Sequence, residues 1–162
     1  MTSPPESPAG PPPGPRPRLA LAPLTPGDYE ALARFRRGLR AFLHFSAEAA
    51  RAEGVAPAQH QLLLAIKGMP PATATATASA DGPTIGEVAE WLVLRHHSAG
   101  ELVDRAVAAG LVVRATDPDD ARCQRLHLTA AGEATLARLS ALHREELRRL
   151  REETFAHLLS LG

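Results

Sequence analysis

The sequence predicts a mostly α-helical fold of the α+β class, with one small antiparallel β-hairpin. Apolar residues recur at three- and four-residue steps through most of residues 25–150, which is the period of amphipathic helices. Residues 111–128 break that period with a short β-branched segment, a turn and an alternating segment, which is the pattern of a hairpin. With 162 residues and 44% hydrophobic side chains, the chain suits one domain with a core.

Two segments differ from the rest in composition. Residues 1–24 hold most of the prolines and show no helical or strand period, so we predict a disordered proline-rich tail. A ligand for proline-binding modules is the less favoured interpretation of this tail. Residues 70–83 alternate alanine with threonine but hold no large apolar residue, and therefore predict a flexible loop rather than a strand.

Overall composition narrows the function classes. Lysine plus arginine equals aspartate plus glutamate at 18 each, so any surface for a polyanion must be a local patch. The single cysteine, Cys123, cannot form a disulfide within the chain, and no apolar run reaches the roughly 20 residues that span a bilayer. Because the first residues also lack a signal-peptide pattern, we expect a soluble cytoplasmic protein.

Two helices are predicted in the first part of the fold, residues 25–70. Thr25, Pro26 and Asp28 form an N-terminal capping pattern, and a long amphipathic helix then runs to about Gly54. Pro57 opens a second helix, which closes at glycine and proline signals near residues 68–71.

Two short helices are predicted in the middle of the chain. Thr84 and Glu87 form a capping-box pattern that opens a helix to about Val93. A further helix over residues 96–109 ends at Gly110, in the usual place of a left-handed cap. Because about three residues join them, the pair predicts a helix-turn-helix. We expect three apolar residues around the turn to lie in the core: Trp91, Leu92 and Leu94.

The predicted hairpin follows directly. In its second strand Leu126 and Leu128 fall on one face and Arg125 and His127 on the other. Thr129 then caps a long helix whose stripe recurs at near-heptad spacing: Leu136, Leu139, His143, Leu147 and Leu150. The long first and last helices present apolar stripes that one small domain cannot cover, which predicts a two-fold dimer.

Residues 116–129, with the sequence TDPDDARCQRLHLT, suggest three chemistries: a metal loop, a redox switch or contact with a polyanion. The aspartates lack the glycine and terminal glutamate of a calcium loop, and they are most simply turn residues around Pro118. Cys123 has no partner cysteine, so we interpret it as a packing residue. Arg122 remains as a permanent positive charge for a polyanion.

The residues AEWLVLRHHSAGELVDRAVAAGLVVRATDPDDARCQRLHLTAAGE resemble the MarR (multiple antibiotic resistance regulator) family of winged-helix transcription factors. The resemblance covers residues 29–150, and its most specific part is a wing signature: Asp120, Arg122, Leu128, Thr129 and Gly132. It implies a winged helix-turn-helix over residues 57–129 with a wing tip at 116–123. Dimerisation helices over residues 25–56 and 130–162 would flank it. A homodimer would bind a pseudo-palindromic operator and repress transcription until a small-molecule effector releases it.

The resemblance also implies contact residues. On the recognition helix and its flanks these are Arg95, His96, His97, Ser98, Gly100, Glu101 and Arg105. On the wing, the resemblance places Arg122 at the tip, where it would enter the minor groove, with Arg125 exposed beside it. We expect Asp120 to position Arg122 or to cap the turn with its carboxylate. In this family, helices that frame an effector cleft carry four histidines of this sequence: His44, His60, His143 and His157. We expect contact with an effector from His44 and His60 only. We expect no metal site, because a zinc site needs several convergent ligands.

The recognition helix departs from the family's habit. It carries Arg95 and Glu101 where relatives usually have a serine or threonine cap and a basic residue. Residues 84–128 hold five arginines against seven acids, a formal charge of −2. A winged helix used only for protein interaction therefore stays open as an alternative. An enzyme is not expected, because the chain has no nucleophile with a base at suggestive spacing, no phosphate-binding glycine loop and no cofactor motif.

Overall fold

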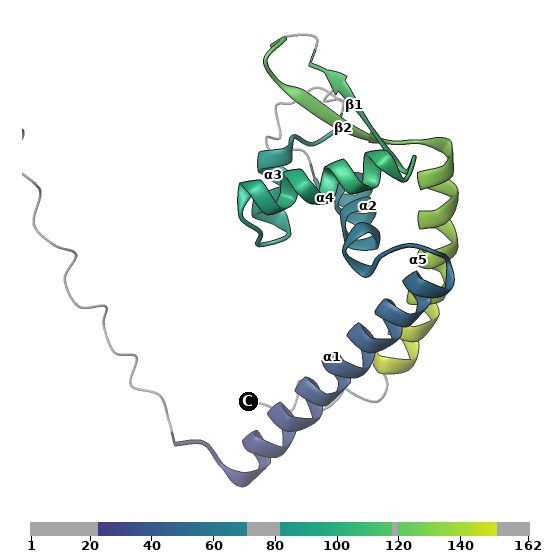
Figure 1. The fold of residues 1–162 in the computed structure, drawn as a ribbon. Helices are drawn as coiled ribbons and strands as arrows, with labels where there is room; N and C mark the ends of the chain where they lie inside the picture. The colour runs from purple at the N-terminus through teal and green to yellow at the C-terminus, as the bar shows by residue number, and fades with distance from the viewer. Residues whose placement is uncertain (1–22, 71–81, 118–119, 152–162) are drawn as a thin grey trace, which may run out of the picture.

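The computed structural model describes residues 23–70, 82–117 and 120–151 (Figure 1). In chain order its elements are α1 (Pro26–Ala52), α2 (Pro57–Gly68), α3 (Ile85–Trp91), α4 (His96–Ala108), β1 (Val112–Thr116), β2 (Gln124–Leu128) and α5 (Ala130–Leu150). The two strands pair antiparallel as one hairpin, with Arg114 opposite Leu126. The predicted mostly helical α+β fold is confirmed. Outside the described residues lie nearly all of the proline-rich tail and of the loop at 70–83, residues 118–119 of the wing tip, and the end of the segment 130–162.

Helices α2, α3 and α4 and the hairpin enclose one hydrophobic core. Its fully buried members come from every one of these elements: Leu62, Leu63, Val88, Val103, Val112 and Leu126. The amphipathic pattern of each segment places these side chains on one face. The core therefore holds the helix-turn-helix and the hairpin together as one winged-helix unit.

The predicted caps form. Thr25 and Thr84 each accept a hydrogen bond from the backbone three residues on, and Asp28 and Glu87 each accept one from the cap backbone in return. At the start of α5, Thr129 Oγ1 accepts from the Gly132 amide at 3.0 Å and donates to the Gly110 carbonyl at 2.6 Å. These bonds join the end of the hairpin to the end of α4.

Gly132 permits the closest backbone approach in this joint. A Cβ at this position would lie 2.1 Å from the Leu111 carbonyl oxygen. No side chain fits there unless α5 moves away from the turn after α4. This gives a structural reason for the glycine of the wing signature.

Helices α1 and α5 run side by side and extend away from the winged helix (Figure 1). Several large apolar side chains on this pair are exposed: Tyr29, Leu32, Leu39, Leu43, Leu142 and Leu147. None of the described helices is long and apolar enough to cross a membrane.

The prediction that Trp91 and Leu94 lie in the core is wrong. Their exposed fractions are 52% and 39%, and only Leu92 packs against the core. Helix α3 ends at Trp91, and Val93 takes a φ of 55°, which is rare for a β-branched residue. This left-handed turn directs the chain into α4 and leaves Val93 91% exposed.

Candidate nucleic-acid interface

Helix α4 presents one face to solvent and packs the other on the core. Ala99, Leu102, Val103 and Ala106 are buried, which leaves the predicted contact residues on the outer side. Among these, Arg95, His96, His97, Glu101 and Arg105 are exposed, and Ser98 and Gly100 are half-buried. All seven therefore lie on or beside one accessible helix face, as the sequence predicts for a recognition helix.

The N-terminus of α4 is electrostatically suited to an anion. Its first turn holds no acidic residue, and the cap residue Arg95 makes no side-chain capping bond. Free backbone amides and the helix dipole favour a phosphate at such an end. The Arg95 side chain has no ion-pair partner among the described residues, so its charge is available.

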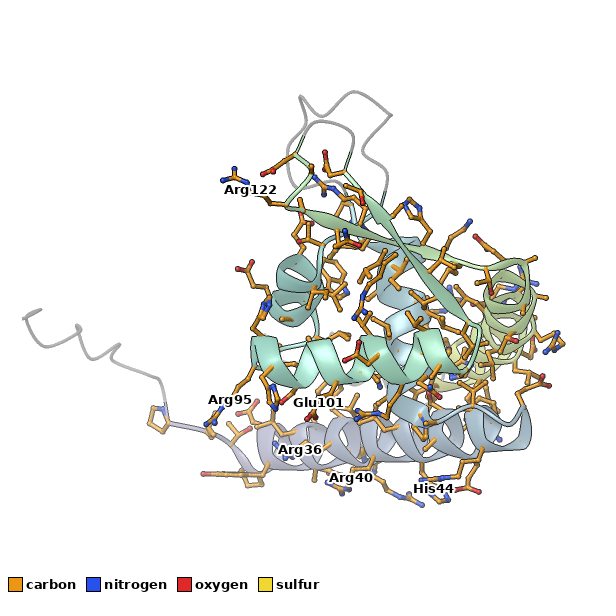
Figure 2. All side chains as sticks on the ribbon, turned by 45° about the horizontal axis from the view of Figure 1, so that its top comes forward. Arg36, Arg40, His44, Arg95, Glu101 and Arg122 are labelled. Carbon is orange, nitrogen blue, oxygen red and sulfur yellow. The ribbon has the colours of Figure 1, made fainter. Side chains whose placement is uncertain are left out.

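Glu101 does not stand alone on this face. Glu101 is labelled on α4 in Figure 2. Its carboxylate lies 3.2 Å from His97 Nε2 and 4.0 Å from Arg105 Nη1, and each partner is four residues away along the helix. Arg105 offsets the negative charge that departs from the family pattern, and His97 adds to this when it is protonated.

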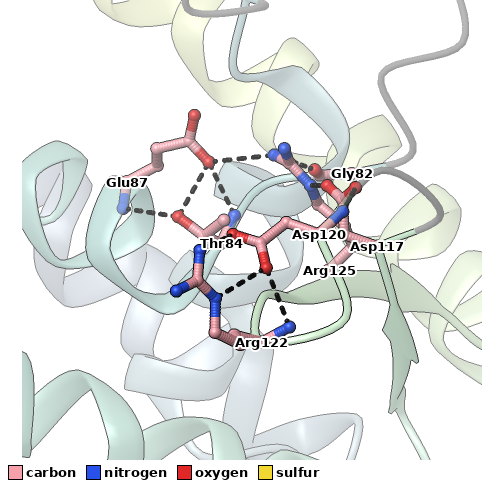
Figure 3. Close-up of polar contacts among 7 residues, drawn as sticks. All are labelled: Gly82, Thr84, Glu87, Asp117, Asp120, Arg122 and Arg125. Carbon is pink, nitrogen blue, oxygen red and sulfur yellow. Dashed lines mark hydrogen bonds and ion pairs between the residues drawn. The ribbon is translucent and has the colours of Figure 1, made fainter.

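At the wing tip Asp120 holds Arg122. The Asp120 carboxylate accepts hydrogen bonds from the Arg122 amide at 3.0 Å, from Nε at 3.1 Å and from Nη2 at 3.3 Å (Figure 3). The Arg122 side-chain bond, followed by the backbone bond, lowers the pKa of Asp120 below its ordinary value. Arg122 itself is 92% exposed. The structure thus contains a direct contact between Asp120 and Arg122, and the role of this contact in placing Arg122 on DNA stays a prediction.

At the wing base Arg125 is enclosed. Its side chain is 24% exposed, and Nε donates to Asp117 Oδ2 at 2.6 Å. Nη1 donates to the Gly82 carbonyl at 3.3 Å and to Glu87 Oε2 at 3.4 Å. The expectation that Arg125 lies exposed beside Arg122 is wrong. The outer edge of β2 is paired here, because Thr84 forms a β-bridge with Arg125 and the Leu126 amide donates to the Pro83 carbonyl. The segment before α3 therefore lies beside the Arg125 side chain, and its Gly82 carbonyl accepts from that side chain.

Most acidic side chains in the described part of the winged helix form ion pairs with arginine or histidine side chains. Within the described part of residues 84–128, five of six acidic side chains form ion pairs: Glu87, Glu101, Asp104, Asp117 and Asp120. Glu90 is the exception among the described residues. The described acids of the winged helix are therefore mostly offset by neighbouring cations, and they do not form an acidic patch on α4.

A second site lies between the winged helix and the pair formed by α1 and α5, which we call the helical arm. A cavity of about 430 Å³ separates α1, α2 and α5, and a neighbouring one of about 360 Å³ extends to α3. Both are lined by Phe42, His60, Leu64 and His143. Three arginines at the C-terminal end of α5 also line the larger cavity: Arg144, Arg148 and Arg151.

His60 and His143 lie next to each other in the wall that both cavities share. Their ring centroids are 4.5 Å apart. His143 contacts the Leu139 carbonyl through Nδ1 at 2.6 Å and Ser46 Oγ through Nε2 at 2.8 Å. Because a carbonyl only accepts, we assign the proton of neutral His143 to Nδ1.

His60 is 3% exposed, and its Nδ1 has no hydrogen-bond partner within the described structure. Burial, followed by the nearby His143, lowers the pKa of His60 to about 4. The ring is therefore neutral near pH 7.

The structure separates the two histidines predicted to bind an effector. His60 lines both cavities, whereas His44 is exposed on α1 and lines neither. His143 was not predicted as a cavity residue, because its spacing matched an apolar helix stripe. No group of three or more metal-ligating side chains occurs among the described residues.

The fold and this surface define the chain as a winged helix-turn-helix protein with an additional helical arm. The sequence model of the MarR family matches residues 53–122. This segment, which holds α2, the helix-turn-helix and most of the hairpin, is therefore similar to the MarR family of transcription regulators. We found no match among curated protein sequences.

Solved structures of the same family are similar over most of their length. One MarR family transcription regulator is 25% identical with a TM-score of 0.62, and the match covers 76% of this chain and 75% of that one. AbsC, a MarR family transcriptional regulator from Streptomyces coelicolor, is 18% identical with a TM-score of 0.62. That match covers 80% of this chain and 82% of AbsC. A mutant of MepR from S. aureus, solved bound to an oligodeoxyribonucleotide, is 18% identical with a TM-score of 0.57. That match covers 77% of this chain and 83% of the MepR chain.

Proposed function

We propose that this protein is a DNA-binding transcription regulator, which binds a pseudo-palindromic operator as a homodimer and represses transcription until an effector releases it. One observation carries the proposal: an accessible α4 and a wing-tip arginine, bonded to its aspartate, project from a winged helix that is similar to the MarR family. A similar protein, MepR, has been solved bound to an oligodeoxyribonucleotide, which supports the same use of the fold.

Helix α4 would enter the major groove, where base edges carry a readable pattern of donors and acceptors. Its N-terminal turn and Arg95 suit contacts with phosphates, and Arg122 suits the narrow minor groove. Glu101 suits the amino group of cytosine, since a carboxylate accepts from that donor.

The exposed apolar side chains of the helical arm support a dimer. Leu32, Leu39 and Leu43 follow one another along one side of α1, and Leu142 and Leu147 are exposed on α5. A second copy related by a two-fold axis would cover them. The two α4 helices would then address half-sites about one helical turn apart, roughly 34–36 Å.

The cavity beside His60 is our candidate effector site. It lies where α2 of the winged helix meets both helices of the arm, so a ligand there contacts both parts. A molecule with an apolar body and one group that hydrogen-bonds His60 Nδ1 would satisfy a buried atom that now lacks a partner within the described structure. If the ligand binds more tightly when the two α4 helices are spaced differently from the spacing that fits DNA, it shifts the population away from the DNA-binding state.

Fluorescence anisotropy tests the proposed function. The probe is a labelled duplex from beside the protein's own gene, titrated over a series of salt concentrations. We expect saturable binding whose affinity falls steeply with salt, because phosphate contacts release counterions. No binding to duplex DNA at low salt would contradict the proposal and favour the protein-interaction module.

A further inference from the structure

We propose that Arg125 is a positioning residue that fixes the wing against α3, so that Arg122 is held where it reaches the minor groove. Arg125 itself makes no contact with DNA. The inference rests on the proposed function and assigns a role to a residue that we expected to be a DNA contact.

The Arg125 cluster, defined as Arg125, Asp117 and Glu87, joins three parts of the chain (Figure 3). Arg125 lies in β2, Asp117 follows β1, and Glu87 lies in the first turn of α3. Glu87 also accepts from the amide and the hydroxyl of Thr84, at 2.7 Å and 2.8 Å. The same carboxylate therefore caps the helix-turn-helix and holds the wing.

The guanidinium of Arg125 is occupied and largely enclosed. Nε donates a hydrogen bond to Asp117, and Nη1 donates to Gly82 and Glu87. The side chain is 24% exposed. The bond to Asp117 is the main reason that the pKa of Arg125 is raised. For a bidentate contact with a phosphate, Arg125 would have to give up these partners, whereas Arg122 is already exposed.

A continuous set of hydrogen bonds leads from the cluster to the wing tip. Asp117 Oδ2 accepts the hydrogen bond from Arg125 Nε, and Asp117 Oδ1 accepts one from the Asp120 amide at 3.1 Å. Asp120 in turn holds the amide, Nε and Nη2 of Arg122. The direction of Arg122 therefore depends on the residues at the base of the wing.

A double-mutant cycle separates positioning from contact. The Arg122→Ala, Arg125→Met and double variants are titrated with the labelled duplex over a salt series. We expect Arg125→Met to weaken binding by at least about fivefold and to lower the salt slope by about one, as Arg122→Ala does. The double variant should bind no more weakly than Arg122→Ala alone.

Additive losses, with a salt slope lowered by about two in the double variant, would overturn the inference and show that Arg125 meets DNA directly. Unchanged binding by Arg125→Met would overturn it as well. Absence of salt-dependent duplex binding by the wild-type protein would instead reject the proposed function, so the two failures are distinguishable.

A second pair of variants remains informative if Arg125→Met fails to fold. Removal of an acid near DNA ordinarily strengthens binding, because it reduces repulsion of phosphates. Asp117→Asn should nevertheless weaken binding by at least about threefold. Glu90→Gln, an exposed acid on α3 outside the cluster, is the matched control and should not weaken it. Equal or stronger binding by folded Asp117→Asn would contradict the inference.

Discussion

Arg122 is the residue on which the proposed DNA contact depends most. It is exposed, permanently charged and held by Asp120 from its own turn. Its exposure also means that the fold gains little from its side chain. Loss of Arg122 should therefore affect binding without affecting stability.

We predict that Arg122→Ala weakens binding to duplex DNA and lowers the salt slope by about one, with an unchanged melting temperature. Anisotropy titrations and thermal unfolding followed by circular dichroism measure the two effects. Arg36→Ala is the control, because Arg36 is an exposed arginine on α1, away from the wing (Figure 2). Equal losses in both variants would mean that only general charge matters.

His60 should give the protein a specific dependence of stability on pH. Its pKa is lowered to about 4 in the folded state from 6.5, so the unfolded chain binds more protons between these values. The contribution of neutral His60 is complete above about pH 6.5 and is lost as pH falls toward about 4. The free energy of unfolding should fall by up to about 1.4 kcal/mol per pH unit from this group.

Urea unfolding of wild type and His60→Leu at several pH values tests this prediction. The variant should lack this part of the slope between about pH 4 and 6.5. Parallel pH profiles for wild type and His60→Leu would show that His60 titrates normally.

At the scale of elements, the joint between the hairpin and α5 depends on Gly132. We predict that Gly132→Ala destabilises the fold by about 1–3 kcal/mol, because its Cβ would meet the Leu111 carbonyl oxygen. Gly100→Ala is the contrast, since a Cβ there has nothing within 4 Å. This change should stabilise α4 by up to about 1 kcal/mol. Denaturant unfolding compares the two, and equal effects would contradict the steric argument.

Elements were predictable where a local rule decides them. Thr25, Thr84 and Thr129 cap helices as predicted, because capping depends on neighbours within about four residues. The exposure of Trp91 was missed because α3 has only seven residues, too few for periodicity to show which side faces the core.

The site was predictable in part for the same reason. Asp120 holds Arg122 from two residues away, within reach of a turn rule. Arg125 was misplaced because strand alternation predicts an outer face and does not show that the carbonyl of Gly82, 43 residues earlier, accepts from its side chain. His60 and His44 both lie on amphipathic helices, and only the packing of α1, α2 and α5 shows which one lines a cavity.

At the scale of the whole molecule, the exposed side of α1 should hold two copies together. We predict that Leu39→Glu converts a dimer to a monomer, because it places a charge in an apolar stripe where the side chain is now 46% exposed. Light scattering at micromolar concentration measures the mass. Ala33→Glu, exposed on a different side of α1, should remain dimeric. A wild-type monomer under these conditions would remove the argument for a dimer.

Amide hydrogen exchange with and without a duplex tests most directly whether α4 and the wing form one DNA-binding surface, as we propose. Added DNA should slow exchange in the N-terminal part of α4, residues 95–105, and around Arg122 at the wing tip. The same duplex should leave the exposed Trp91 side of α3 unchanged. Unchanged exchange in α4 and the wing under conditions of saturated binding would contradict the account.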